Sequence, residues 1–358
     1  MPASENPNSV RIGLIGAGFI AQVAHLHAFS KIAQARVVML AEPHAGLREL
    51  VSARFKIGNT TADYMELLDR SDIDGVVICA PRRAQSHFVK DALSTSRAVL
   101  SEKPMAMTLE TASELVELAG RNNALWMVGY MKRHDAGVQR FARLLADLRA
   151  SGEMGSILHV QMRDFCATYG VAVPDHIRRD GPRPVRYKEA PIAPAFVPEE
   201  LRSQYDYTIN VASHDINLLR LLFAEGFAPL SFSIRPHGVQ HAIFDASEFL
   251  MDLVVGPCDL GRWDQRLDVT FAKGRASLIL PSPMSREQNA VIEVESPDRR
   301  ESSTKSNKEE KRVGAFEAQA RAFVEMIRSG IKSPLCSGDD AVTDVMLIDQ
   351  MWRMVAVR

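Results

Sequence analysis

A short glycine-rich segment near the start of the chain has the residue types and spacing that suit a dinucleotide. It reads Gly16-Ala17-Gly18-Phe19-Ile20-Ala21, a GxGxxA pattern. The first glycine permits a tight turn, Gly18 lets the backbone approach a pyrophosphate, and Ala21 lets a helix pack closely on a strand. The helix N-terminus supplies unpaired N–H groups and a positive dipole for the phosphates. The predicted phosphate-binding residues are Gly16, Gly18, Phe19, Ile20 and Ala21.

An acidic residue in the expected place supports this reading of the turn. The apolar run Val10–Ile15 precedes the turn, a helical pattern follows it, and Glu42 comes directly after a second apolar run, Arg36–Ala41. A carboxylate there can accept both ribose hydroxyls of NAD and repels the 2′-phosphate of NADP. NAD is therefore the favoured cofactor over NADP, although His44 and Arg48 lie nearby in the sequence.

The elements that must position this turn alternate regularly over the first third of the chain. Apolar strands that are each followed by a helix predict a parallel sheet covered on both faces. The expected strands are Val10–Ile15, Arg36–Ala41, Gly75–Ala80, Ala98–Ser101 and Leu125–Gly129. The expected helices are Ile20–Ala33, Ala45–Phe55, Tyr64–Asp69, His87–Leu93 and Leu109–Arg121.

After about Tyr130 the pattern changes. Asp135–Ala150 is helical, Ser156–Phe165 alternates like a strand, residues 170–206 carry little periodicity and predict a long loop, and Val211–Phe223 returns to helix. Alternating strands then predict an antiparallel sheet with one packed and one open face. These strands are Ser231–Pro236, Ser247–Val255, Arg266–Ala272, Ala276–Leu280 and Ala290–Glu295, and the closing helices are Ala315–Arg328 and Asp339–Val355.

The expected organisation is therefore an α/β protein of two domains. Residues 1–9 are expected to be a disordered tail, residues 10–130 a Rossmann domain, and residues 131–358 a substrate and oligomerisation domain with a mostly antiparallel sheet. The closing helices are expected to pack back on the Rossmann domain.

Composition excludes several classes of function. The formal net charge of −1 gives no reason to expect nucleic acid or an acidic membrane as partner. The four cysteines lack the spacing of a zinc site or a disulfide framework, which fits a reducing cytoplasm. The first residues lack the basic region and following apolar stretch of a signal peptide, so none is expected. No apolar run approaches the length of a membrane span.

The segment Ala98–Met107 contains Glu102-Lys103-Pro104 after a short strand, and this resembles the EKP motif of the Gfo/Idh/MocA oxidoreductases. The resemblance also includes Ala80-Pro81 at the end of the expected strand Gly75–Ala80 and a His-Asp-x-Asn motif that begins at His214. It implies an N-terminal Rossmann domain and a C-terminal domain with an open, mostly antiparallel sheet that forms a dimer or tetramer interface. The cofactor site would include Ala80, Pro81, Gln85, Glu102 and Lys103.

The resemblance also implies the catalytic residues. Lys103 would hold a substrate hydroxyl beside the nicotinamide, and burial readily lowers the pKa of an ammonium so that it can help to move the proton. Glu102 would orient Lys103 or balance its charge. His214 would act as acid and base, since the unperturbed pKa of histidine lies near neutrality. A solvated turn lysine and a structural histidine are the alternative interpretations of Lys103 and His214.

Several positions depart from the family pattern. Family members commonly have Asp four residues before the histidine, where this chain has Asn210, and often a further Asp where it has Asn217. Asn210 can hydrogen-bond but cannot stabilise an imidazolium electrostatically, which puts the proton relay in question. Gln85 stands where a histidine is often found. Arg133 and Asn217 are predicted to bind substrate, with an interdomain salt bridge as the alternative for Arg133.

Two further patterns carry weaker expectations. His25 and His27 lack a third ligand, so helix packing and surface exposure are favoured over a metal site, and no metal is predicted. The arginine-rich stretch Ile177–Arg186 suggests an anionic or phosphorylated substrate, with a solvated loop or an oligomer contact as alternatives.

The sequence thus predicts a cytoplasmic, homo-oligomeric NAD(P)-dependent oxidoreductase. It would transfer a hydride between nicotinamide and a secondary alcohol or ketone of a sugar, inositol or related polyol. The alternative is a dinucleotide-binding regulatory or scaffold protein on the same fold that has lost catalysis, because fold alone does not fix function. Asn210 favours this alternative, and the combination of Lys103 with His214 favours the enzyme.

Overall fold

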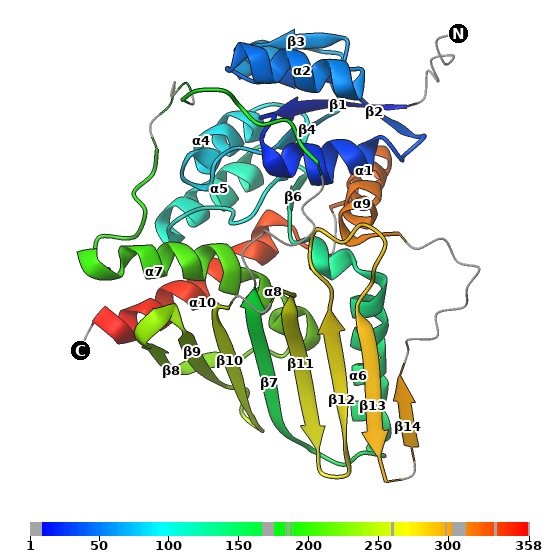
Figure 1. Cartoon of the computed structure of the whole chain (residues 1–358), viewed down its shortest axis with the longest axis vertical. Helices are drawn as coiled ribbons and strands as arrows, with labels where there is room; N and C mark the ends of the chain where they lie inside the picture. Colours follow the sequence, from blue (N-terminus) through cyan, green and yellow to red (C-terminus); the bar gives the residue numbers. More distant parts are fainter. Residues whose placement is uncertain are drawn as a thin grey trace. The chain divides into compact units, whose positions relative to one another are not determined.

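The computed structural model describes residues 9–166, 175–182, 184, 187, 189–258, 261–297, 299–302, 313–332 and 335–356. These residues fall into two compact units, each with its own sheet (Figure 1). The first unit comprises Met1–Tyr130, Pro174–Pro191 and Phe316–Val342, and the second comprises Met131–Val173, Ile192–Ala315 and Thr343–Arg358. The division therefore differs from a single break after residue 130, because two later segments join the first unit.

The first unit contains a six-stranded sheet in the order β3-β2-β1-β4-β5-β6, and every neighbouring pair is parallel. Its strands are β1 (Val10–Ile15), β2 (Ala35–Ala41), β3 (Asn59–Thr61), β4 (Gly75–Ile78), β5 (Ala98–Ser101) and β6 (Trp126–Val128). The predicted parallel sheet is confirmed. Strand β3 was not expected, because its three residues, Asn-Thr-Thr, are largely exposed and leave no apolar pattern.

The helices of the first unit are α1 (His27–Phe29), α2 (Ala45–Phe55), α3 (Tyr64–Leu68), α4 (Arg82–Leu93), α5 (Leu109–Arg121) and α9 (Ala315–Ser329). Helix α4 begins five residues earlier than predicted, directly after Pro81. Before α1 the chain is π-helical over Ala21–Leu26, a conformation that is rare and often marks functional sites. Helix α9 packs on β4, where a Cβ added to Gly75 would lie 2.5 Å from Ile327 Cδ1.

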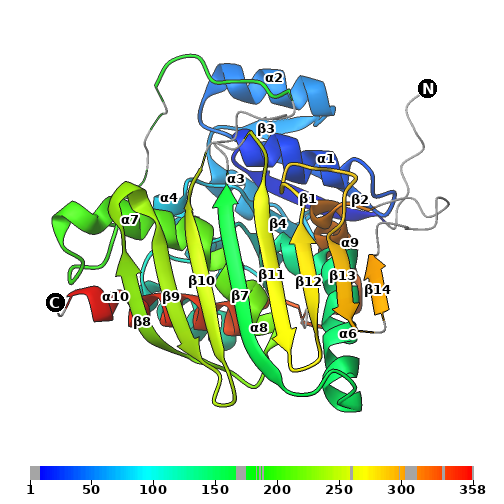
Figure 2. The same ribbon diagram turned by 60° about the horizontal axis from the view of Figure 1, so that its bottom comes forward.

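The second unit contains an eight-stranded sheet in the order β14-β13-β12-β11-β7-β10-β9-β8 (Figure 2). Only β7 and β10 pair in parallel among these described strands, so the predicted, mostly antiparallel sheet is confirmed. The strands are β7 (Ile157–Cys166), β8 (Ala228–Ile234), β9 (Gln240–Asp245), β10 (Leu250–Pro257), β11 (Asp264–Phe271), β12 (Gly274–Leu280), β13 (Val291–Ser296) and β14 (Arg299–Ser302). Strand β9 was missed because the polar Gln240 occupies a buried position and interrupts the apolar alternation.

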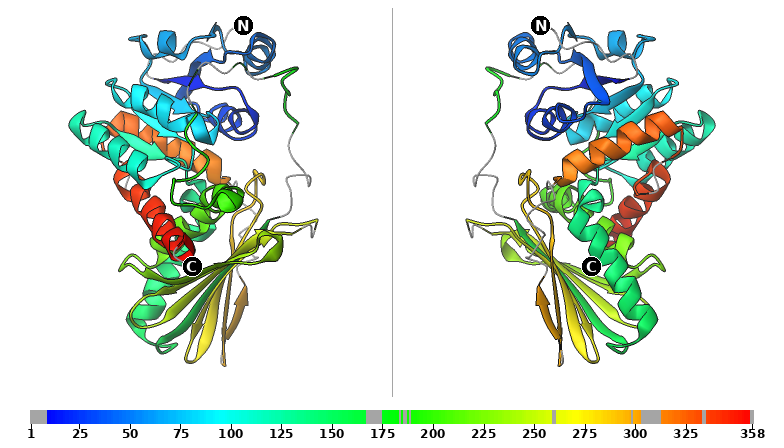
Figure 3. Two further views of the ribbon diagram at one scale, coloured as in Figure 1. Left: turned by 90° about the vertical axis from the view of Figure 1, so that its left-hand side faces the viewer. Right: turned by 90° about the vertical axis from the view of Figure 1, so that its right-hand side faces the viewer.

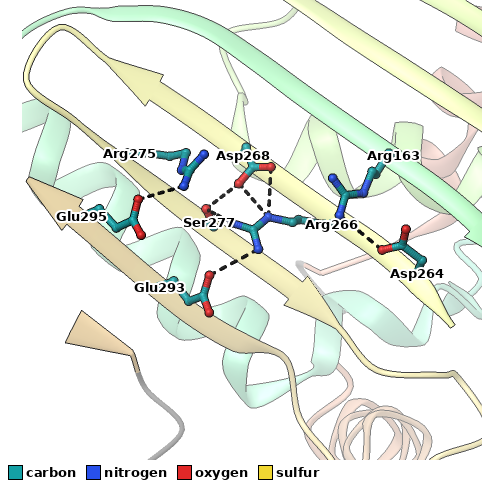
Figure 4. A network of polar contacts seen from close by, with 8 residues as sticks. All are labelled: Arg163, Asp264, Arg266, Asp268, Arg275, Ser277, Glu293 and Glu295. Atoms are coloured by element: carbon teal, nitrogen blue, oxygen red, sulfur yellow. Dashed lines mark hydrogen bonds and ion pairs between the residues drawn. The ribbon is translucent and has the colours of Figure 1, made fainter. Parts of the chain in front are cut away.

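One face of this second sheet is packed and the other is open. Along β11 buried and half-exposed residues alternate strictly, with Leu267 and Val269 on the packed face. Edge-on views show helix α6 (Ala136–Ser151) along one face only (Figure 3). The open face carries an ion-pair network that joins Arg163 with Asp264, Arg266 with Asp268 and Glu293, and Arg275 with Glu295 (Figure 4). These side chains are half-buried, except that of Arg275, which is exposed, so each pair stabilises the fold only slightly.

The predicted loop 170–206 is wrong at its C-terminal end. The chain is helical without a break through α7 (Arg202–Tyr207), a π-helical stretch Thr208–Ala212, and α8 (Ser213–Leu222). Tyr205 is the one fully buried residue of α7, so the segment lacks the repeated apolar spacing by which a helix is recognised. The last helix, α10 (Gly338–Ala356), buries Trp352, whose indole N–H donates to Thr208 Oγ1 at 3.0 Å.

Candidate active site

The glycine-rich turn lies where strand order reverses in the first sheet, between the ends of β1 and β4. Gly16 has φ +92°, and a Cβ there would lie 2.5 Å from the carbonyl oxygen of Cys79 at the end of β4. Gly18 is exposed, and a Cβ at Gly18 would meet nothing within 4 Å. The turn therefore needs glycine at position 16 and leaves open space beside its backbone at position 18. In open α/β sheets this switch point is where ligands bind.

Glu42 lies beside the same turn with its carboxylate fixed by two backbone donors. Glu42 Oε2 accepts from Ala17 N at 2.9 Å, and Oε1 accepts from His44 N at 3.0 Å. The residue is buried. Arg48 donates to the backbone carbonyl of Glu42 at 2.6 Å. Since each carboxylate oxygen has two lone pairs, Glu42 keeps capacity to accept further hydrogen bonds.

These residues fit a dinucleotide. The open space at Gly18, the start of a helix at Phe19 and Ile20, and the buried carboxylate of Glu42 supply what a pyrophosphate and a ribose need. Ala21 is fully buried, which agrees with its predicted role in close packing. Ala80 and Pro81 are half-buried at the start of α4, next along the sheet.

Lys103 is the second residue after the end of β5 and is half-buried. The peptide bond between Lys103 and Pro104 is cis. The backbone N–H of Lys103 donates to Glu102 Oε2 at 3.2 Å, so Glu102 contacts the main chain of its neighbour. The side-chain amide of the fully buried Gln85 donates to the carbonyl oxygen of Glu102. Gln85, Glu102 and Lys103 are thus brought together as the sequence predicts, and their roles in cofactor binding stay predictions.

His25 belongs to this cluster, although the sequence interpretation placed it in helix packing or at the surface. It is buried, and its Nε2 lies 2.7 Å from Glu102 Oε1. Burial by itself lowers the pKa of His25, but the contacts with Cys79 and Glu102 outweigh it and raise that pKa to about 10. His25 is therefore protonated at neutral pH and balances the buried carboxylate of Glu102.

The second unit contains Asn210 and His214 on the continuous helix from α7 to α8, and both are half-buried. The sequence interpretation placed them one α-helical turn apart. The structure instead makes Thr208–Ala212 π-helical, and this conformation has more residues in each turn than an α-helix. Asn210 thus precedes His214 by slightly less than one turn. No signal in the sequence marks this change.

A buried acidic pair beside His214 was also missed. Asp164 on β7 and Asp215 on α8 are 1% and 0% exposed. Gln265 Nε2 donates to Asp215 Oδ1 at 2.5 Å, and the buried Lys132 donates to Gln265 Oε1 at 2.5 Å. Burial, followed by the charge of Asp164, raises the pKa of Asp215 well above its ordinary value, and burial raises that of Asp164. Two buried carboxyl groups in contact share a proton rather than both ionise.

The two residues predicted to bind substrate lie against each other. Arg133 Nη2 donates to the carbonyl oxygen of Asn217 at 2.9 Å, and Asn217 Nδ2 donates to Asp344 Oδ2 at 2.7 Å. Arg220 also donates to Asp344, at 2.8 Å. Arg133, Asn217 and Asp344 are at most 3% exposed. These contacts favour a role in holding α8 and α10, and substrate binding by Arg133 and Asn217 stays a prediction.

The described residues contain neither a metal-binding cluster nor a membrane-spanning helix. No group of three or more His, Cys, Asp or Glu side chains there could hold a metal ion. None of the helices in the described part is long and apolar enough to cross a membrane.

Comparisons with known proteins give a family for the first domain and a fold for the whole chain. Residues 10–130 match the model of the oxidoreductase family with an NAD-binding Rossmann fold. A dTDP-3,4-didehydro-2,6-dideoxy-alpha-D-glucose 3-reductase of Saccharopolyspora spinosa is 33% identical over 166 residues, which cover 45% of this chain and 46% of the reductase. Inositol 2-dehydrogenase of Salmonella typhimurium is 23% identical over 272 residues, or 75% of this chain and 74% of that enzyme.

A solved structure extends the likeness to nearly the full length. A 3-ketoreductase from Actinomadura kijaniata in complex with NADP and TDP-benzene has a TM-score of 0.73 and 20% identity, and the match covers 96% of both chains. At this identity the likeness concerns the fold. The match to curated relatives such as the 3-reductase spans about half of their length. Residues 10–130 therefore match the NAD-binding Rossmann domain of the Gfo/Idh/MocA oxidoreductase family, and the resemblance seen in the motifs is confirmed.

Proposed function

We propose that the protein is an NAD(P)-dependent oxidoreductase that acts on a secondary alcohol or ketone of a sugar, inositol or related polyol. The observation that carries the proposal is the cluster at the end of β5, where the protonated His25 holds Glu102 next to Lys103. The pair fixes the main chain at Lys103, and a lysine at the edge of a dinucleotide site is suited to bind a substrate oxygen. The activities of two similar proteins, a ketosugar 3-reductase and an inositol 2-dehydrogenase, support the same substrate class.

The proposed chemistry divides between the cofactor and the protein. Bound nicotinamide accepts or donates the hydride. Lys103 binds the substrate oxygen as a hydrogen-bond donor, and His214 takes up or returns the hydroxyl proton. Asn210 serves as a hydrogen-bonding partner in the position where a carboxylate is commonly found. The protein thus positions the substrate and handles one proton while the cofactor carries the redox change.

The finer features follow from particular residues. Glu42 favours NAD over NADP because a second negative charge at the ribose would be repelled. An anionic substrate remains the expectation from the arginine-rich stretch, of which residues 183, 185 and 186 lie outside the described part. The open face of the second sheet is the proposed interface of a homodimer or homotetramer. We place the protein in the cytoplasm, and we expect neither nucleic acid nor membrane as partner.

The test is NADH formation across a panel of polyols and sugars, with the reverse reaction run on the matching ketones. We expect turnover with at least one substrate and a loss of 10²- to 10⁴-fold in kcat when Lys103 is changed to Ala. Lys90→Ala is the matched control, because Lys90 is an exposed lysine on α4. Tight NADH binding without turnover of any substrate would favour the inactive dinucleotide-binding protein, for which Asn210 is the supporting feature.

A further inference from the structure

A segment from the middle of the sequence lies against the dinucleotide loops of the first unit. Residues 175–180, here called the strap, follow β7 in the sequence but belong to the first unit. The green trace beside α2 in Figure 1 contains them. The sequence interpretation expected this arginine-rich region near the substrate, and its first residues contact the loops of the dinucleotide site.

The strap is anchored first on the helix that follows the glycine-rich turn. Gln22 Oε1 accepts from Ile177 N at 2.9 Å, and Gln22 Nε2 donates to the carbonyl oxygens of Ile177 at 2.9 Å and of Ala17 at 2.8 Å. The side chain of Ile177 packs on the hydrophobic core of the first unit. The ring of His176 meets the ring of Phe19 edge-on, with 4.9 Å between centroids. Gln22 thus ties the turn and the strap together, and it is 3% exposed.

The second anchor is on the loop after Glu42. His44 Nδ1 accepts from Leu47 N at 3.1 Å and so caps α2. Because Nδ1 is the acceptor, Nε2 carries the proton and donates to the carbonyl oxygen of Asp180 at 2.7 Å. Arg54 on α2 pairs with Asp175 at 3.2 Å. The strap is therefore held at both its ends.

The two loops that hold the strap are those at which a dinucleotide binds. In a site of this kind the pyrophosphate binds at the turn that contains Phe19 and precedes Gln22, and the ribose binds at Glu42, two residues before His44. We propose that the strap retains the bound dinucleotide, so that its contacts with Gln22 and His44 slow release of the cofactor. The proposal rests on the proposed function, because it takes the ligand to be a nicotinamide dinucleotide. Gln22, His176 and His44 thereby become determinants of cofactor residence time.

The test is the rate at which NADH leaves the full-length protein, followed by fluorescence after mixing with excess NAD. Gln22→Leu removes the hydrogen bonds to Ile177. His44→Asn retains a capping oxygen for α2, since Asn is a good N-cap, but is too short to reach Asp180. Each variant is expected to raise the dissociation rate constant about fivefold or more, the effect of about one net hydrogen bond. The association rate constant should stay within about twofold.

A matched control is available on α5, whose N-cap is Thr108. Thr108→Asn makes the same kind of change at a helix cap that has no contact with the strap, and it should leave the dissociation rate unchanged. A second readout does not depend on rates of binding. Arg178 and Arg179 are exposed on the strap, so NADH should slow trypsin cleavage after them, and Gln22→Leu should weaken this protection.

Three results would overturn the proposal or its basis. An unchanged dissociation rate in both variants would show that the strap does not retain the cofactor. A faster association with unchanged dissociation would show that the strap blocks the site instead. Failure of the unmodified protein to bind NADH or NADPH would contradict the proposed function itself, and this outcome is distinct from the other two.

Discussion

His25 and Glu102 form a buried pair in which Nε2 and Oε1 lie 2.7 Å apart. They come from different elements, the helix after the glycine-rich turn and the end of β5. The pair joins the phosphate-binding end of the predicted cofactor site to the lysine proposed for catalysis, since Glu102 also accepts from the backbone of Lys103. The first three predictions concern residues of this kind, whose partners were not evident in the sequence.

Removing His25 should cost more than the loss of one hydrogen bond. In His25→Leu the carboxylate of Glu102 is left buried without its counter-charge, and we expect a loss of about 3 kcal/mol in the free energy of unfolding. Glu102→Gln in the same background should restore part of this loss, because a neutral amide needs no counter-charge. Urea denaturation of the two single variants and the double variant measures the coupling. Additive losses would contradict a direct interaction.

The free energy of unfolding should fall at alkaline pH because of His25 and at acidic pH because of His134. The folded-state pKa of His25, about 10, lies above its ordinary value of 6.5, so its contribution is complete below pH 6.5 and is lost as pH rises to 10. Burial, together with the charge of Arg133, lowers the pKa of His134 to about 4, so its contribution is complete above pH 6.5 and is lost toward pH 4.

Thermal unfolding between pH 4.5 and 9.5 checks both signs. His25→Leu should flatten the alkaline flank and leave the acidic one, and His134→Leu should do the reverse. For each proton that only one of the folded and unfolded states binds, the free energy of unfolding changes by about 1.4 kcal/mol per pH unit. A variant that flattened the wrong flank would refute the assignment of that histidine.

Replacing one carboxyl group of the Asp164–Asp215 pair by an amide should leave stability nearly unchanged, whereas replacing both should lower it. In Asp164→Asn the amide donates to Asp215 as a shared proton does, so we expect a change within about 1 kcal/mol. The double variant Asp164→Asn/Asp215→Asn removes the anionic charge near Lys132 and should lose about 3 kcal/mol or more. Adding Lys132→Met should restore stability. Thermal unfolding of the series decides the matter, and a double variant as stable as the single would speak against the shared proton.

Asn210→Asp should change the acid–base behaviour of the proposed catalytic histidine. A carboxylate on the preceding turn stabilises an imidazolium, so the pKa of His214 should rise by about 1 unit, and the limb of the pH–rate profile that reports His214 should move to higher pH. Asn210→Ala supplies the control without charge. An unchanged profile in Asn210→Asp would mean that position 210 is not coupled to the proton transfer.

Glu42→Ala should reduce discrimination between the two cofactors. Without the carboxylate the ribose hydroxyls of NAD lose their acceptor and a 2′-phosphate is no longer repelled, so we expect the affinity ratio to move toward NADP by about tenfold or more. Fluorescence titration with NADH and NADPH measures both dissociation constants. Arg48→Gln is the control, because Arg48 donates to the backbone carbonyl oxygen of Glu42. An unchanged ratio in Glu42→Ala would remove Glu42 as the determinant.

Most of the first sheet was predictable because its strands are continuous apolar runs. Strand β1, strand β5 and helices α2 and α5 have the bounds that the sequence predicts. The errors fall where an element lacks a regular hydrophobic period. The buried Gln240 of β9 is polar, the Asn-Thr-Thr of β3 is polar and largely exposed, and α7 buries Tyr205 alone.

By itself the sequence determined the dinucleotide turn, the acidic residue beside it and the lysine after β5, because each is a short motif whose chemistry depends on neighbouring residues in the chain. Only the tertiary structure decided which distant residues hold these motifs in place. His25 and Glu102 are 77 positions apart, and Gln22 and Ile177 are 155 apart. Such pairs leave no periodic signal, since the sheet that brings them together is formed by strands far apart in sequence and their meeting depends on how the whole unit packs.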